Sequence, residues 1–169
     1  MSESTICPGC QVELPASGLP AEDRLGASVE CWMLNGEVTG FELQHLAALG
    51  RFHQLAVDAY GAQHAGGDGR GIRLAYSLVG LHLALERGRG GLEVRDAHRR
   101  MGRPDASWPA FTRRDGAWAS TVLDVAEAGL RAGSVEGHAA AVTRWAADVW
   151  RAWAPEHAAA AALCARLRL

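Results

Sequence analysis

Three cysteines in the first part of the chain have the types and spacing that suit metal binding. Cys7 and Cys10 flank a Pro-Gly turn in the stretch STICPGCQVELP, residues 4–15. A Cys-x2-Cys pair across such a turn is typical of a zinc knuckle, in which two thiolates point at one ion. Cys31 can supply a third thiolate, because it lies in the first turn of an expected helix, where the helix dipole lowers a thiol pKa. The sequence therefore predicts a zinc site at Cys7, Cys10 and Cys31.

Other roles for the cysteines are weaker. A redox motif would need a strand before Cys7 and a helix after Cys10, and neither is expected. A disulfide is disfavoured, because the chain starts without the segments of a signal peptide, which predicts a cytoplasmic location with reduced thiols. Cys31 could instead be a small buried residue beside Trp32. Cys164, in an Ala-rich segment, is interpreted as a core residue.

A fourth ligand follows from the expected pairing of two helices. We expect one helix from Ser28 to about Leu46 and a second from about Arg51 to His64, joined by a turn centred near residue 48. Cys31 lies about 17 residues before that centre and His64 about 16 after it. Antiparallel helices would then bring His64 beside Cys31, and the predicted metal set is Cys3His.

Proton-transfer candidates for a catalytic metal lie on the second helix. They are His53, Asp58 and Tyr60, which could act beside an ion that activates water or polarises a carbonyl. His53 is about 16 Å from His64 along a helix, so the two cannot share one ion. It lies instead near His45, across the expected turn, where a second polar site could form.

Simpler roles are expected for the remaining polar and aromatic candidates. For His45, His53 and His82 we expect hydrogen-bonded, partly buried side chains. Asp58 and Glu86 are interpreted as solvated or capping acids. Of the six tryptophans, Trp145 and Trp153 are assigned to the core, whereas Trp32 and Trp108 could either pack or line a pocket for a flat ligand.

The hydrophobic periodicity predicts an all-α fold. Ser28 and Ser134 are expected N-caps, and Thr121 with Asp124 forms an expected capping box. Residues 1–27 lack a sustained period and contain several Pro and Gly, so they are expected to form an irregular arm. The prediction is a single domain, in which a bundle of five to seven helices at 28–169 carries this arm, pinned by zinc.

Composition excludes several classes of function. All 17 basic residues are Arg and the net charge is −2. Without Lys, neither a Schiff-base lysine nor a lysine-bearing phosphate loop can occur. Without a basic stripe, a nucleic-acid partner is not expected. Charged residues interrupt every apolar run, so no membrane span is expected.

Several longer stretches resemble a known family. They are CPGC, ASVECWMLNGE, FHQLAVDAYGAQHAG, LVGLHLALERG and RWAADVWRAWAPEH. Together they resemble a family of small bacterial proteins, frequent in actinobacteria, classed as a domain of unknown function. Its members usually carry Pro where this chain has Ala65. The resemblance supplies no activity, but it implies a shared pattern of residues: Cys7, Cys10, Cys31, His53, Asp58, Tyr60, Gln63, His64 and Trp153.

Two functional hypotheses follow from these observations. In the first, the zinc is structural and the protein is a binding or interaction module, with a protein partner or a separate His- and Trp-lined pocket for a small molecule. In the second, the protein is a zinc-dependent enzyme acting on small molecules. The first is favoured, because thiolate-rich zinc sites are usually closed.

Overall fold

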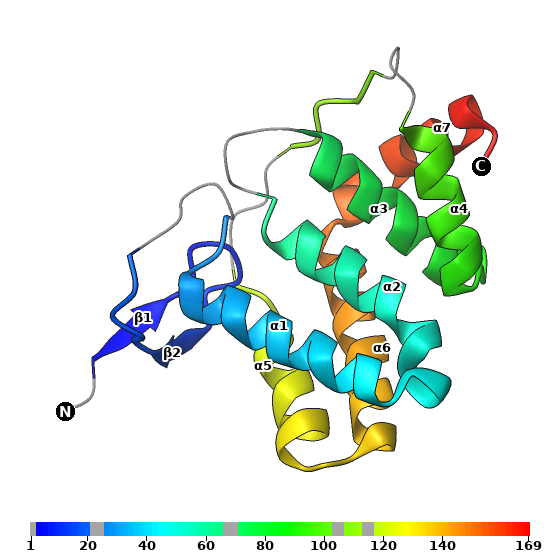
Figure 1. Cartoon of the computed structure of the whole chain (residues 1–169). Coiled ribbons are helices and arrows are strands. Elements are labelled where there is room, and N and C mark those ends of the chain that lie inside the picture. Colours follow the sequence, from blue (N-terminus) through cyan, green and yellow to red (C-terminus); the bar gives the residue numbers. More distant parts are fainter. Residues whose placement is uncertain (1–2, 21–25, 66–70, 103–106, 113–116) are drawn as a thin grey trace.

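The computed structural model describes residues 3–20, 26–65, 71–102, 107–112 and 117–169, and these form an all-α bundle with one small sheet (Figure 1). The two strands are β1 (Ser4–Ile6) and β2 (Glu13–Pro15). The helices are α1 (Val29–Gln44), α2 (Leu46–Gln63), α3 (Gly71–Leu85), α4 (Gly91–Met101), α5 (Val122–Val125), α6 (Val135–Ala152) and α7 (His157–Leu167), with a π-helical turn η2 (Ala126–Arg131) and a 3-10 turn η3 (Ala154–Glu156). In the described part of the chain, no helix combines the length and the hydropathy that crossing a bilayer requires.

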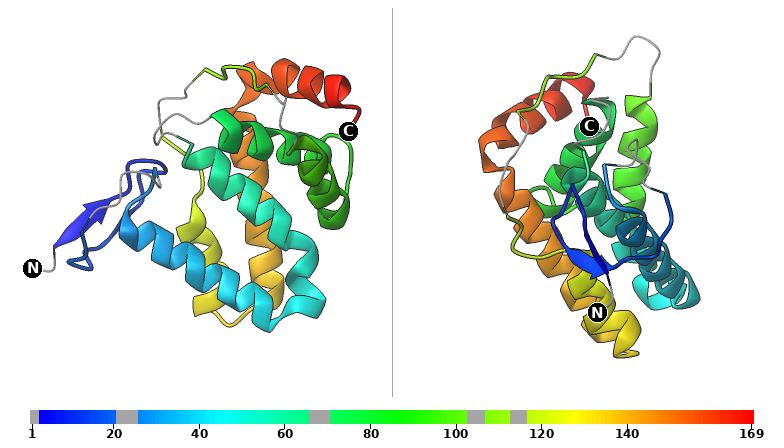
Figure 2. Two further views of the ribbon diagram at one scale, coloured as in Figure 1. Left: turned by 45° about the horizontal axis from the view of Figure 1, so that its top comes forward. Right: turned by 90° about the vertical axis from the view of Figure 1, so that its left-hand side faces the viewer.

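The first residues of the chain are more regular than the sequence suggested. β1 and β2 form an antiparallel hairpin in which Thr5 faces Leu14. The hairpin encloses the Cys7–Cys10 turn and stands at the N-terminal end of α1 (Figure 2). Leu14 is buried and joins the core. The expectation of an irregular arm is therefore wrong for this part, because strands of three residues are too short to show a period in sequence.

The helix ends follow the expected caps. The Ser28 hydroxyl accepts from the Cys31 N–H at 3.2 Å, and the Ser134 hydroxyl accepts from the Gly137 N–H at 2.9 Å. The Asp124 carboxylate accepts from the Thr121 N–H at 2.7 Å, which closes the predicted capping box. These bonds satisfy amide groups that have no partner within the helix, and so fix where α1, α5 and α6 begin.

The junction of α1 and α2 differs from its predicted place. The chain turns at the single residue His45, and the stretch LAALG, residues 46–50, forms the start of α2. Leu and Ala are strong helix formers, so they extend the helix through Gly50. α1 and α2 nevertheless run antiparallel and in contact, as expected (Figure 1).

Two groups of buried side chains form the core, with α3 between them. The larger surrounds Trp145 and joins the hairpin, α1, α2, α5 and α6. The smaller joins α3, α4 and α7 and contains Cys164. Leu78 on α3 belongs to the first group and Val79 to the second. Since α3 is buried on two faces, it fixes α4 and α7 to the rest of the bundle.

Glycines allow α2 and α3 to approach closely. A methyl group at Gly61 would overlap the Ser77 hydroxyl, and one at Gly80 would overlap the Asp58 carboxylate. Asp58 is 3% exposed. The α2–α3 contact therefore depends on the absence of a side chain at these points.

Replacing Gly80 tests this close approach against a matched helical glycine. Gly80→Ala should lower the free energy of unfolding by about 1–3 kcal/mol, because the added methyl group overpacks the Asp58 side chain. Gly36→Ala on α1 is the control, because its methyl group would enter open space, and it should raise stability by up to about 1 kcal/mol through helix propensity. Urea denaturation of both variants measures the difference, and equal effects would contradict the predicted overlap.

Candidate metal centre

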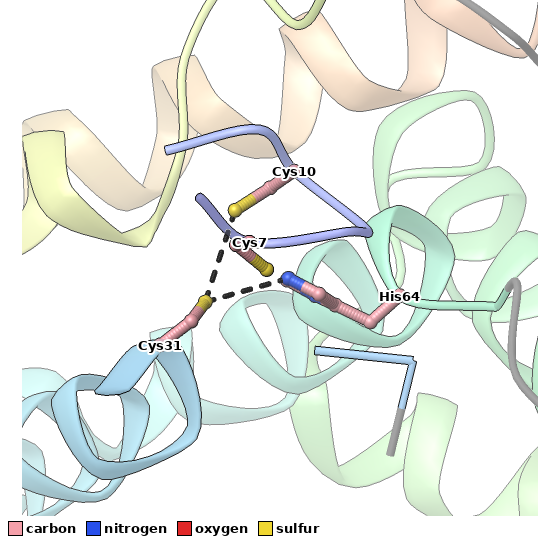
Figure 3. A group of neighbouring side chains, drawn as sticks. All are labelled: Cys7, Cys10, Cys31 and His64. Carbon is pink, nitrogen blue, oxygen red and sulfur yellow. Dashed lines mark hydrogen bonds between the residues drawn. The ribbon is translucent and has the colours of Figure 1, made fainter. Parts of the chain in front are cut away.

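Three cysteines and one histidine meet at the end of the bundle where the hairpin joins it. Cys7 and Cys10 come from the turn of the hairpin, Cys31 from the first turn of α1, and His64 from the C-terminal end of α2 (Figure 3). All four side chains are at most 2% exposed. Their three Sγ atoms and the His64 nitrogen lie within 4.8 Å of one another. The structure thus brings together all four predicted ligands.

Two of the distances within this Cys3His group match those of a tetrahedral metal site. The Sγ atoms of Cys10 and Cys31 are 3.7 Å apart, and the Cys31 Sγ is 3.5 Å from the His64 Nε2. Around tetrahedral zinc, with bonds of about 2.3 Å to sulfur and about 2.0 Å to nitrogen, these separations would be about 3.8 and 3.5 Å. A disulfide would require sulfurs about 2.05 Å apart. The group therefore has the size and shape to hold one metal ion.

Tyr60 orients His64 toward the thiols. The His64 Nδ1 lies 2.7 Å from the Tyr60 carbonyl oxygen, so the N–H on Nδ1 donates there and Nε2 faces the sulfurs. The Tyr60 ring stacks on the His64 ring with centroids 3.9 Å apart. Its hydroxyl donates to the Cys31 Sγ at 3.7 Å. Such contacts to the groups behind a ligand are typical of protein metal sites.

Backbone groups of the Cys7–Cys10 turn form hydrogen bonds both within the hairpin and with the bundle. The Cys7 N–H donates to the Val12 carbonyl, and the Gln11 N–H donates to the Cys7 carbonyl, both at 2.9 Å. The indole N–H of Trp118 donates to the Gly9 carbonyl at 3.0 Å. A Cβ at Gly9 would lie 2.5 Å from the His64 ring, so glycine is needed where the turn meets this ligand.

The thiol groups of the Cys3His group, considered without a metal, have pKa values shifted in different directions. Hydrogen bonds from Cys10 and Cys31 lower the pKa of Cys7. For Cys31 the effect is the opposite. Its hydrogen bond with Cys10, and to a lesser extent that with Cys7, raises its pKa, and burial raises it further. The expectation that the helix N-terminus would lower the pKa of Cys31 is therefore wrong for the thiol group by itself. A divalent cation is the natural means of holding several buried thiolates together.

The three proton-transfer candidates do not converge on the thiols. Tyr60 contacts Cys31, but the pKa of the Tyr60 hydroxyl is raised. The main cause is its burial, and the second is the charge of Cys31. His53 bonds to Glu42, toward the other end of the α1–α2 pair. Asp58 faces α3 instead of α1, and Gln54 donates to its Oδ1 at 3.2 Å. The expectation of a solvated or capping Asp58 is wrong, because the close approach of α2 and α3 buries it.

A second polar cluster contains residues that the sequence analysis missed. Glu42 is 1% exposed and accepts two hydrogen bonds, from His53 Nδ1 at 2.7 Å and from His138 Nε2 at 2.9 Å. Glu42 lies eleven residues after Cys31, and His53 eleven before His64. The antiparallel pairing that joins Cys31 to His64 therefore also predicts the Glu42–His53 contact. Nothing in the local pattern points to His138, which comes from α6.

The remaining candidates have structural partners. The indole N–H of Trp150 donates to Glu86 at 2.8 Å, and Arg87 donates to His82 at 3.4 Å. Trp145 and Trp153 are buried as predicted, whereas Trp32 is 47% exposed. Gln63 accepts from the Trp145 indole at 2.9 Å and donates to the Ser120 carbonyl at 2.7 Å. Gln63 thus ties α2 to α6 and to the segment before α5.

Fold and site together define a helical-bundle protein whose N-terminal hairpin carries half of a Cys3His group. The chain matches the profile of a family of unknown function, DUF5946, over residues 5–154, and it belongs to that family. The matched region includes all four residues of the Cys3His group. Comparisons with curated proteins and with solved structures give no match.

The Glu42 cluster predicts a pH-dependent contribution to stability. The hydrogen bond to Glu42 raises the pKa of His53 above its usual 6.5. Although burial alone would raise the pKa of Glu42, hydrogen bonds from His138 and His53 lower it. A raised histidine pKa stabilises the folded state below about pH 6.5, and this stabilisation is lost as the pH rises through the folded value. His53→Ala should therefore destabilise the protein more at pH 6 than at pH 9.

Urea denaturation at the two pH values measures this effect, with Glu42→Gln as the background that isolates it. In Glu42→Gln the cost of adding His53→Ala should no longer be greater at pH 6, because the neutral amide gives no preference for the charged imidazole and burial disfavours it. An equal cost of His53→Ala at both pH values in the parent would show that the Glu42 contact does not favour protonated His53.

Proposed function

We propose that the chain is a zinc protein in which the metal is structural, held by Cys7, Cys10, Cys31 and His64. The observation that carries the proposal is the match between the two ligand separations and a tetrahedral zinc site. Three thiolates and one imidazole favour zinc over hard cations such as Mg²⁺ or Ca²⁺.

A structural role is supported by the number and burial of the ligands. Four protein ligands complete a tetrahedron and leave no position for water or substrate. The group is buried at the junction of the hairpin, α1 and α2. Zinc there would fasten the hairpin to α1 and α2, which matters because strands of three residues are marginal by themselves.

A binding or interaction module is the function that this arrangement supports best, with a protein or a small molecule as partner. The four cysteines are free, which suits a reducing compartment such as the cytoplasm. A net charge of −2 with no Lys gives no support for a nucleic-acid partner. The alternative of a zinc-dependent enzyme would need an open metal position, and the first experiment below tests for one.

Metal analysis tests the ligand set. Protein purified without chelator should contain about one zinc per chain, and Cys31→Ser should lose most of it. Cys164→Ser is the matched control and should keep its zinc, because Cys164 lies in the smaller core group with α3 and α4. Co²⁺ exchanged into the site should give an absorption spectrum that cyanide leaves unchanged, as expected of four fixed ligands. Absence of metal would contradict the site, and a cyanide-sensitive spectrum would favour the enzyme.

A pair of histidine variants tests what the metal holds in place. His64→Ala should weaken zinc binding and make the N-terminal hairpin sensitive to protease, because complete structural zinc sites contribute on the order of 10 kcal/mol. His53→Ala on the same helix should keep its zinc and the protection of the hairpin. Limited proteolysis with mass spectrometry locates the cuts. Full protection in His64→Ala, with zinc retained, would show that His64 is not a ligand.

A further inference from the structure

A cavity of about 410 Å³ lies between α2, α3 and α4, away from the Cys3His group. This volume is within the range of pockets that bind small molecules. Its apolar wall includes Phe52 and Leu55 from α2, Leu85 from α3 and Val94 from α4. None of its lining residues is His or Trp, so it differs from the pocket that the sequence suggested.

Asp58 gives this cavity a polar wall. Its side chain lines the cavity and is almost completely buried, and its Oδ2, which has no hydrogen-bond partner among the described residues, lies against Gly80 of α3. The nearest basic group is His98, whose Nε2 is 3.9 Å from the Asp58 Oδ1 and lies 3.0 Å from the Tyr76 carbonyl. Burial raises the pKa of Asp58 well above its usual value, which favours the neutral carboxyl group over a carboxylate that would repel an anion. A buried polar group without a partner costs stability and is a feature of ligand sites.

The other polar groups of the cavity favour an anion. Arg51 and Arg89 both line it. Arg51 lies over the Phe52 ring, with its guanidinium carbon 4.8 Å from the ring centroid. Arg89 pairs with Glu93 at 2.8 Å, but both side chains are 54% exposed, and such surface pairs are weak and exchange partners readily.

The N-terminal end of α4 adds to this preference. Gly90 and Gly91 line the cavity where α4 begins, and a helix N-terminus attracts negative charge. The Glu93 carboxylate already accepts from the Gly90 N–H at 2.9 Å. This contact shows that the start of α4 can hold a carboxylate, here that of Glu93, which does not itself line the cavity.

We propose that this cavity binds a small organic acid with an apolar body. Its anionic group lies at the mouth with Arg51 and Arg89, and its body lies along Phe52, Leu55 and Val94. The guanidinium groups of the two arginines can only donate hydrogen bonds, which selects a ligand whose anionic group accepts them. The cavity shares no residue with the Cys3His group, so this proposal is independent of the bound metal.

Three probes of the same shape and different charge test the ligand class. They are 3-phenylpropionate, 3-phenylpropanamide and 3-phenylpropylamine, titrated into the full-length protein with its metal while the amide signals of Leu55 and Gly91 are followed by NMR. The carboxylate should bind saturably and at least about tenfold more tightly than the amide, as expected for one or two charge-assisted hydrogen bonds. Tighter binding of the amine, or no saturation by the carboxylate below about 10 mM, would overturn the proposal.

Arginine variants test the residues at the mouth. Arg51→Gln and Arg89→Gln should each weaken binding of 3-phenylpropionate by about tenfold, for loss of one charged donor. Arg131→Gln is the matched control, because Arg131 lies on η2 and pairs there with Glu127, and it should bind the probe like the parent. Parent-like binding in both mouth variants would overturn the proposal.

Discussion

The antiparallel contact between α1 and α2 is the constraint on which the rest of the structure depends. Cys31 meets His64 near one end of this pair, and Glu42 meets His53 near the other. Both contacts follow from one alignment of the two helices, since a slip by one residue would rotate each partner by about 100° around its axis. The hairpin then joins at the Cys31 end, and α6 contributes His138 at the Glu42 end. The Cys3His group and the buried hydrogen bonds of Glu42 thus specify the same helix register from opposite ends.

Much of this arrangement could be predicted, because it rests on local chemistry. The Cys7–Cys10 spacing, the Ser28 cap that places Cys31 in a first helical turn, and the antiparallel return of the chain together point to Cys3His. The predicted turn was centred three residues too late, yet the structure still places His64 beside Cys31 as expected. Moving the turn to His45 lengthens α2 at its start and shortens α1, while the end of α2 stays beside the start of α1. The prediction survived because a side chain near a helix end reaches over about one turn.

Some contacts between residues far apart in the sequence could not be predicted. His138 meets Glu42 from 96 residues away, and the Trp118 indole meets Gly9 across 109 residues. No local period encodes such partners, because each depends on how whole helices stack. Asp58 was misjudged for the same reason: an aspartate on a helix is usually solvated, but here a glycine on the facing helix brings α3 against it. Gly80 in the middle of α3 was the available signal, since an interior helical glycine often marks close packing.

α2 takes part in several of these contacts, because its different faces meet different elements of the bundle. Toward α1 it presents His53, Tyr60 and His64, and toward α3 it presents Asp58. Gln63 reaches Trp145 on α6 and the Ser120 backbone. A helix that is polar on several buried faces is held by specific hydrogen bonds as well as by apolar contact, and each bond accepts a narrow range of helix positions. The Cys3His group and the cavity that Asp58 lines therefore lie on different faces of one helix, whose rotation and position along its axis these hydrogen bonds fix. A metal ion at His64 and a ligand in the cavity would each favour the same placement of α2.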